Sequence, residues 1–295
     1  MIVPLSLPST QRMKVVQQML EDGRDAWYAN YSWRPAKLFD TVNRALTIFI
    51  TQPEIQTKTF ATCYQKWTSD DRDGLFDRVM YCEVSRTRPF FWIPKIAMPI
   101  ESCILKKMLM KTFRNVARFI KPNGAKIYYR VGGGLYWKVF TLETPKFILN
   151  GVKGHSSRET NLAVINGKVA VALVAAMSSD VFWWWYTITS NVRDLNPFDV
   201  NNFPIPESLV DDADVIAKGR KYLTDLERNS EMLTRVQKKT GITKTQSFRI
   251  KLSKPIIDEI DELLAKHYGF TEEELDFIIN YDIKYRMGDE LNAGD

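Results

Sequence analysis

The chain has 295 residues, 45% apolar and 26% charged, and its 41 Lys and Arg against 35 Asp and Glu give a formal net charge of +6. This length suits one large domain or two ordinary ones. Three cysteines without paired spacing and two histidines exclude a disulfide framework and a local Cys/His zinc site, so we expect a reducing, cytoplasmic environment. The longest apolar run, 169–188, is broken by Ser178, Ser179 and Asp180 and has no basic leader, which argues against a membrane span and a signal peptide.

The first hundred residues alternate between strand-like and helix-like patterns, which is typical of an α/β fold. We predict, in chain order, a strand at 2–5, a helix at 11–21, aromatic or β-branched strand-like runs at 27–31 and 46–50 with a loop at 34–40 between them, and a helical stretch at 68–88. Prolines at 89, 94 and 99 then mark a candidate domain boundary.

The middle of the chain mixes helices with short strands. We predict a helix at 100–113, strands at 126–130, 135–141, 146–150 and 161–165, and helices at 169–178 and 180–187. Three glycines at 132–134 are expected to form a hairpin turn and not a phosphate-binding loop, because no helix pattern follows them. The helix at 180–187 carries three consecutive tryptophans and is aromatic on every side, so core packing is its expected role.

The last ninety residues are expected to be a helical scaffold. Apolar residues at helical spacing predict a long amphipathic helix over 207–239 and a second helix over 255–267. Thr271 and Glu274, three residues apart, form a capping box that opens a last short helix.

Charge is distributed unevenly along the chain. Residues 101–170 contain thirteen Lys and Arg against three acids, so 13 − 3 = +10, whereas 207–295 contain fourteen basic and nineteen acidic residues, so 14 − 19 = −5. Aromatic rings are interleaved with the cations of the basic segment, a combination that suits a polyanion such as DNA. A solvated surface is the alternative explanation of the same charges.

Three passages, "IVPLSLPSTQRMKVVQQML", "WYANYSWRPAKLFDTVNRALTIFITQ" and "VALVAAMSSDVFWWWYTITSNVRDLNPFDVNNFPIP", together resemble one family. They are similar to the C-terminal half of adenine-N6 DNA methyltransferases of type IIG restriction-modification systems, which end in a TaqI-like specificity domain. The resemblance implies three parts: residues 1–98 as the C-terminal part of a methyltransferase domain with a Rossmann-like sheet, 99–206 as an α+β target-recognition domain, and 207–295 as C-terminal helices.

Two sequence motifs of that family are missing from the chain. Neither the cofactor loop nor the Asn-Pro-Pro-Tyr motif that holds a flipped adenine occurs, and the nearest match, Asn196-Pro197-Phe198, lacks the second proline and is expected to be a turn. The chain alone is therefore expected to bind no cofactor and to be inactive. The complete enzyme implies S-adenosylmethionine, double-stranded DNA and an N-terminal methyltransferase half or subunit as partners. The alternative is a stand-alone DNA-binding specificity protein that docks to a separate methyltransferase or nuclease subunit.

The resemblance also implies residue roles. By position, Phe39 matches an aromatic residue that stacks on the flipped base, with Tyr31 as second choice, although a plain core role for Phe39 is equally compatible with the sequence. The candidate DNA-binding residues are Arg114, Arg118, Lys121, Lys126, Tyr129, Arg130, Lys138, Lys153, His155, Ser156 and Arg158. Asp70, Asp71 and Asp73 are interpreted as a solvated helix face, so no metal site is predicted.

Overall fold

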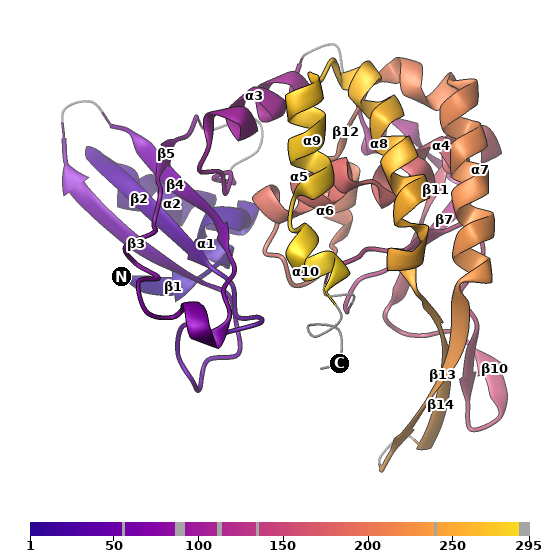
Figure 1. Ribbon diagram of the computed structural model, residues 1–295. Helices are drawn as coiled ribbons and strands as arrows, with labels where there is room; N and C mark the ends of the chain where they lie inside the picture. The colour runs from indigo at the N-terminus through magenta and orange to yellow at the C-terminus, as the bar shows by residue number, and fades with distance from the viewer. Residues whose placement is uncertain (55–56, 86–91, 111–113, 134–135, 239–240, 289–295) are drawn as a thin grey trace. The chain divides into compact units, whose positions relative to one another are not determined.

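The computed structural model describes residues 1–54, 57–85, 92–110, 114–133, 136–238 and 241–288 (Figure 1). It is a mixed α/β protein with several small, mostly antiparallel sheets. The chain divides into two compact units, one formed by Met1–Lys106 with Trp185–Arg193 and the other by Lys107–Trp184 with Asp194–Asp295. This division differs from the predicted boundaries, because residues 207–295 belong to the same unit as 107–184.

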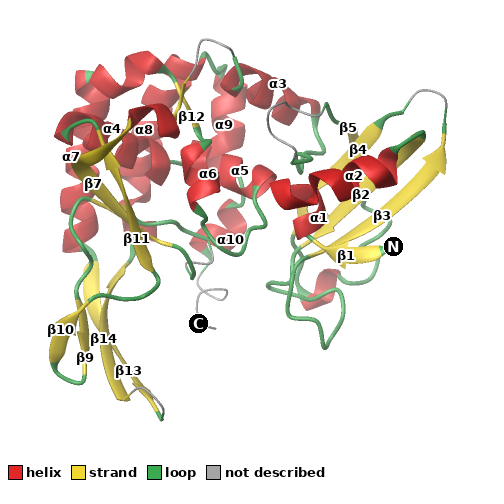
Figure 2. Cartoon of the chain, turned by 180° about the vertical axis from the view of Figure 1, so that it is seen from behind, coloured by secondary structure: helices red, strands yellow, loops and turns green. Residues whose placement is uncertain are grey.

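The first unit is built on one five-stranded sheet. Its strands are β1 (Ile2–Pro4), β2 (Arg24–Tyr31), β3 (Leu46–Pro53), β4 (Thr59–Gln65) and β5 (Cys82–Glu83), in the order β1-β3-β2-β4-β5. The helices α1 (Ser6–Ser9) and α2 (Lys14–Glu21) follow β1, with a 3-10 turn at Gln11–Met13 between them (Figure 2). The strands expected near 2–5, 27–31 and 46–50 are thus confirmed. A Rossmann-like arrangement is not, because among the described pairs only β2 and β4 run parallel.

The helical stretch predicted over 68–88 is wrong for the described part of that range. Only a 3-10 turn forms, at Ser69–Asp71, and turns connect it to β5. Thr68 and Asp71 cap this turn reciprocally, and Gly74 adopts a left-handed φ of +73° a few residues later. A left-handed residue ends right-handed helical geometry, which explains why the apolar spacing does not yield a longer helix. Residues 86–88 lie outside the described residues.

The second unit contains three small sheets. A two-stranded sheet pairs β6 (Arg114–Asn115) with β12 (Pro204–Ile205), and a three-stranded sheet has the order β11 (Glu159–Val164), β7 (Ile120–Arg130), β8 (Phe140–Thr141). A four-stranded antiparallel sheet has the order β10 (Val152–Gly154), β9 (Phe147–Leu149), β14 (Gly241–Phe248), β13 (Ser230–Gln237), and it projects from the helices of this unit in both views (Figure 1, Figure 2).

The strand predicted at 135–141 and the hairpin turn at 132–134 are only partly correct. β7 and β8 are antiparallel neighbours, as a hairpin requires, but β8 is limited to Phe140–Thr141 and the connection is longer than a tight turn. Gly133 has a left-handed φ of +90°, which suits the glycine there. Gly134 and Leu135 lie outside the described residues.

The helices of the chain after β5 are α3 (Pro99–Met108), α4 (Gly167–Ser178), α5 (Asp180–Thr189), α6 (Pro197–Asn201), α7 (Ala213–Arg228), α8 (Lys254–Tyr268), α9 (Glu272–Asn280) and α10 (Ile283–Met287). Short 3-10 turns occur at Val116–Phe119, Glu207–Asp211 and Ile250–Ser253. The capping box of Thr271 and Glu274 is confirmed at the start of α9.

The long helix predicted over 207–239 is wrong at both ends. Asp212 accepts the backbone N–H groups of Asp214 and Val215 and so fixes the start of α7, and the chain leaves the helix at Asn229 to form β13. β13 pairs with β14 along its whole length, from Ser230 opposite Phe248 to Gln237 opposite Gly241. The acidic C-terminal part is therefore not purely helical, since it supplies half of the four-stranded sheet.

The tryptophan-rich segment lies in the core, as predicted. All side chains from Val169 to Ser190 are buried, and Phe182 makes edge-to-face contacts with Phe140 and Phe203. Of the helices that the structure describes, none is long and apolar enough to cross a membrane alone. α4 and α5 meet that criterion only as a pair, bent by 68°.

Candidate nucleic-acid interface

A cleft of about 530 Å³ lies in the second unit, between β7 with its following loop and the four-stranded sheet. It is lined by five of the predicted DNA-binding residues, which are Tyr129, Arg130, Lys138, Ser156 and Arg158. Half-buried aromatic rings also line it, from Tyr128, Trp137, Phe147 and Phe248. Cations and rings that are dispersed in the sequence thus converge on one concave surface.

The alternation along β7 decides which of its side chains are available in the cleft. Ile127 and Tyr129 are buried, whereas Tyr128 and Arg130 are more accessible, as expected where successive side chains point to opposite faces. The Tyr129 ring is only 4% exposed and packs against Phe140 with ring centroids 5.7 Å apart. Burial raises the pKa of Tyr129 to about 12. Tyr129 is a core residue beneath the cleft, so its ring is not accessible for stacking on a base.

The opposite wall of the cleft is formed largely by β13 and β14, and the residues of β13 are predicted from the sequence to be helical. In β13, Leu233, Arg235 and Gln237 line the cleft, and their register partners in β14 include Thr243 and Thr245. Arg235 was missed as a candidate because residues 230–237 were expected to be helical. The β-branched residues Ile242, Thr243 and Thr245 are the local signal that favours a strand in β14.

Three arginines of the cleft have no carboxylate within salt-bridge distance among the described residues. They are Arg130, Arg158 and Arg235, and all three are exposed. Burial, followed by the charge of Arg158, lowers the pKa of Arg130, while Glu159 across the strand pair opposes that shift. Because these arginines repel one another, the cleft favours an anion.

Lys138 adds a buried cation to the same cleft. It is 8% exposed, and its Nζ donates to the carbonyl oxygen of Gly133 at 3.4 Å. Burial lowers the pKa of Lys138 to about 8, and the charges of Asp194 and Asp199 act in the opposite direction. Its charge therefore titrates close to physiological pH.

The remaining predicted DNA-binding residues lie outside the cleft. Arg114 forms an ion pair with Glu207 at 3.8 Å, so its charge is partly neutralised. The side chains of the others are exposed on β7, the preceding 3-10 turn, β10 and the loop that follows it; they belong to Arg118, Lys121, Lys126, Lys153 and His155. The structure therefore divides the eleven candidates into a group of five in the cleft and a group of six elsewhere on the second unit.

The C-terminal helix supports one wall of the cleft. The Arg286 guanidinium lies 3.9 Å from the ring centroid of Trp137, and the Trp137 Nε1–H donates to the Arg286 carbonyl oxygen at 3.2 Å. Arg286 is itself 1% exposed and forms an ion pair with Asp180 at the start of α5. Trp137 is thus held in place by a buried charge.

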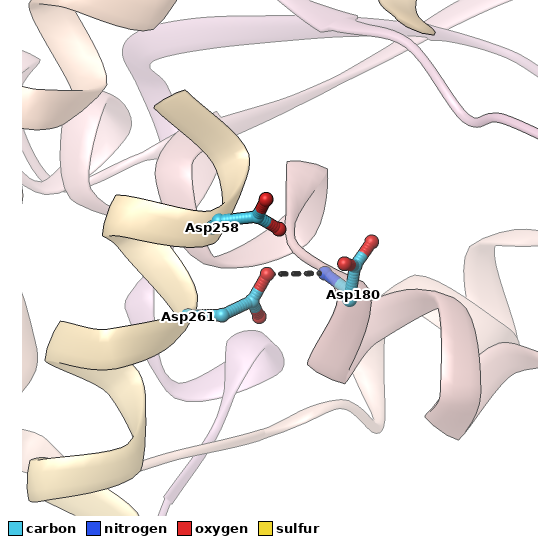
Figure 3. Close-up of side chains that lie close together, drawn as sticks. All are labelled: Asp180, Asp258 and Asp261. Carbon is cyan, nitrogen blue, oxygen red and sulfur yellow. Dashed lines mark hydrogen bonds between the residues drawn. The ribbon is translucent and has the colours of Figure 1, made fainter. Parts of the chain in front are cut away.

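Asp180, Asp258 and Asp261 form an acidic cluster behind this wall, with one oxygen of each within 4.8 Å of the others (Figure 3). Lys254 Nζ lies 3.0 Å from Asp180 and also pairs with Asp258. Asp261 accepts the backbone N–H groups of Asp180 and Val181 at 3.1 Å each, and burial and then the charge of Asp180 raise its pKa.

Lys254 and Arg286 supply two positive charges to the three carboxylates. This arrangement suits a structural network that joins α8 and α10 to the start of α5.

In the first unit, the two candidates for base stacking have opposite environments. Phe39 is 41% exposed, and the Arg72 guanidinium fixes its loop by donating to the carbonyl oxygens of Lys37 and Leu38 at 3.0 and 3.1 Å. Tyr31 is 1% exposed and contacts Trp67 edge to face, so it is a core residue. A surface ring is available to a base without a change of fold, which favours Phe39 over Tyr31.

The segment nearest to the methyltransferase motif, Asn196-Pro197-Phe198, lies at the start of α6. The amide of Asn196, in the nearest match to the methyltransferase motif, caps α6 and donates to Asp194 and Asp199. An adenine amino group is held by an acceptor, and the Asn196 side chain already accepts from the backbone N–H of Asp199 in the capping box. The expected turn at 196–198 is therefore wrong: Asn196 is the N-cap, and Pro197 and Phe198 are the first residues of α6.

Comparison of the chain with protein-family models and with curated protein sequences gives no match.

Proposed function

We propose that this chain binds DNA through the cleft of its second unit and serves as the C-terminal recognition part of an adenine-N6 DNA methyltransferase of a restriction-modification system. The observation that carries the proposal is the convergence of Arg130, Arg158 and Arg235, which have no carboxylate within salt-bridge distance among the described residues, beside half-buried rings. Phosphate oxygens are the natural ligands of unpaired guanidinium groups.

The cleft also offers groups that can discriminate between bases. Ser156, Thr243, Thr245 and Gln246 line it with hydroxyl and amide groups, which read base edges by hydrogen bonding, whereas the arginines anchor the backbone. Affinity from phosphates and selectivity from polar groups are the two components of sequence-specific recognition.

Methyl transfer requires a second part. Because the sequence lacks the cofactor loop and the Asn-Pro-Pro-Tyr motif, S-adenosylmethionine and the adenine-holding motif come from an N-terminal half or subunit in this proposal, and Phe39 adds a ring to the flipped base. Isothermal calorimetry with S-adenosylmethionine and this chain alone should show no binding. Tight binding would contradict this division of roles.

A second candidate function is a stand-alone specificity protein that docks to a separate methyltransferase or nuclease subunit. The exposed apolar surface of α2 favours a docking role, because Val15, Val16 and Met19 are 62%, 43% and 71% exposed. Adding a candidate N-terminal methyltransferase half separates the two functions, since only the first predicts restored methylation.

Duplex binding across salt concentrations tests the DNA-binding claim that both functions share. Phosphate contacts predict a linear fall of log K with log salt. A flat response would remove the argument for DNA.

A further inference from the structure

The size of the cleft restricts what part of DNA can enter it. A volume of about 530 Å³ is that of a cube with edges of about 8 Å, whereas the major groove of B-DNA alone is roughly 12 Å wide. Pockets of about 300–1,000 Å³ are typical of sites for small organic ligands. The interior of the cleft is therefore suited to one nucleotide, whereas a paired duplex cannot enter it and can contact only its exposed residues, which include Arg130, Arg158 and Arg235.

One wall presents a ring and a cation side by side. Tyr128 and Arg130 are two residues apart on β7 and so lie on the same face, where their partners across the strand pair are Asn161 and Glu159. The Tyr128 ring is half-buried and has no ring contact or hydrogen bond among the described residues. It can therefore accept a flat ligand without losing an internal interaction.

The facing wall of the cleft also presents an aromatic ring and a cation, which come from two different strands. Phe147 of β9 and Arg235 of β13 both line the cleft, and their register partners Thr245 and Thr243 are neighbours on the same face of β14. Arg158 completes the cationic side of the space. A flat base between two walls of rings, joined to backbone phosphates beside the three arginines, is the ligand that these groups complement.

We infer that the cleft binds a single nucleotide displaced from the DNA duplex, with its base on Tyr128 and with its own phosphate and the neighbouring backbone phosphates beside Arg130, Arg158 and Arg235. The inference rests on the proposed function, because it assumes that the cleft faces DNA. A displaced base has lost its neighbours in the stack, and an aromatic ring replaces them. A mismatched or unpaired nucleotide is the cheapest to displace, so the cleft should prefer DNA that contains one.

The test compares a fully paired 20-bp duplex with the same duplex carrying one bulged adenosine, by fluorescence anisotropy with the full chain. Wild type should bind the bulged duplex more tightly. Stacking is worth about 1–3 kcal/mol per base, so Tyr128→Ala should weaken binding of the bulged duplex by about 5-fold to 150-fold and leave the paired duplex unchanged. Tyr128→Phe keeps the ring and should retain the preference, and Tyr81→Ala, an exposed tyrosine of the first unit, is the matched control.

The outcomes separate this inference from the proposed function. Equal affinity for the two duplexes, with Arg158→Gln still weakening both, would overturn the nucleotide site and leave DNA binding intact. Absence of binding to either duplex would overturn both. Deoxyadenosine 5′-monophosphate is added as a competitor. If the free nucleotide displaces neither duplex at low concentration, the ligand is a nucleotide within DNA. Tight binding of the free nucleotide, together with equal affinity of the chain for the paired and the bulged duplex, would identify a site for free nucleotides and refute the inference.

Discussion

Replacing the three cleft arginines Arg130, Arg158 and Arg235 together with glutamine should reduce the salt dependence of DNA binding. None of the three has a carboxylate within salt-bridge distance among the described residues, so each is available for one phosphate. Counterion release lowers the slope of log K against log salt by about 0.9 for each phosphate contact in B-DNA. Loss of three contacts should therefore make the slope less steep by about 2.7.

This difference is large enough to measure by fluorescence anisotropy on a paired duplex. Between 50 and 200 mM salt the concentration changes fourfold, and a slope difference of about 2.7 corresponds to about a 40-fold difference in the loss of affinity. Wild type should thus weaken about 40 times more than the triple variant over this range. Glutamine retains hydrogen-bonding capacity, so the change isolates the charge.

A control with the same net charge decides whether the position of the cations matters. Lys146 and Arg249 form ion pairs with Glu227 at 2.9 Å and Glu231 at 2.7 Å, and Arg220 lies on α7 outside the cleft. Changing Lys146, Arg220 and Arg249 to glutamine should alter the slope by less than about one. If both triple variants lower the slope equally, binding depends on net charge and the reasoning from the cleft is refuted.

Three further predictions concern single residues. The pKa of Lys138, about 8 against an ordinary 10.5, means that the unfolded chain binds more protons between those values. Stability should therefore rise with pH from about 8 to 10, and Lys138→Met should remove that rise in urea denaturation at a series of pH values. Arg286→Ala leaves the buried Asp180 with one cation fewer and should lower the free energy of unfolding by about 3–5 kcal/mol, whereas an unchanged midpoint would exclude a structural role. Phe39→Ala should leave the melting temperature of the chain within about one degree, because its ring is on the surface, but should reduce methylation once the N-terminal half is added; undiminished turnover would exclude stacking.

Local signals in the sequence predict those elements whose ends and faces are encoded by neighbouring residues. The capping box of Thr271 and Glu274 needs only residues three positions apart, and the buried run of α4 needs only its composition. β13 is different, because Met232, Leu233 and Val236 continue the helical spacing of the preceding segment. The pairing with β14 that converts 230–237 into a strand is a tertiary interaction, which no local pattern contains.

The charges of the candidate site could likewise be predicted from the sequence only in part. The basic residues near 130 and 158 were identifiable from composition, and β7 and β11 bring them together as neighbours. Whether a given cation is neutralised depends on acids far along the chain, as with Arg114 and Glu207. For that reason, sequence alone could not separate the residues in the cleft from the solvated remainder.

The positive surface of the second unit is consequently narrower than the +10 of residues 101–170 suggests. The acidic C-terminal part contributes Glu207 and Glu227, which neutralise Arg114 and Lys146. The same part contributes Arg235, which adds a third charge to the cleft. The acidic C-terminal part thus neutralises cations outside the cleft and adds a cation inside it, which concentrates the positive potential beside the aromatic rings of the cleft. Since a ligand is attracted by the local potential and not by the summed charge of a segment, the fold and not the composition determines where DNA would bind.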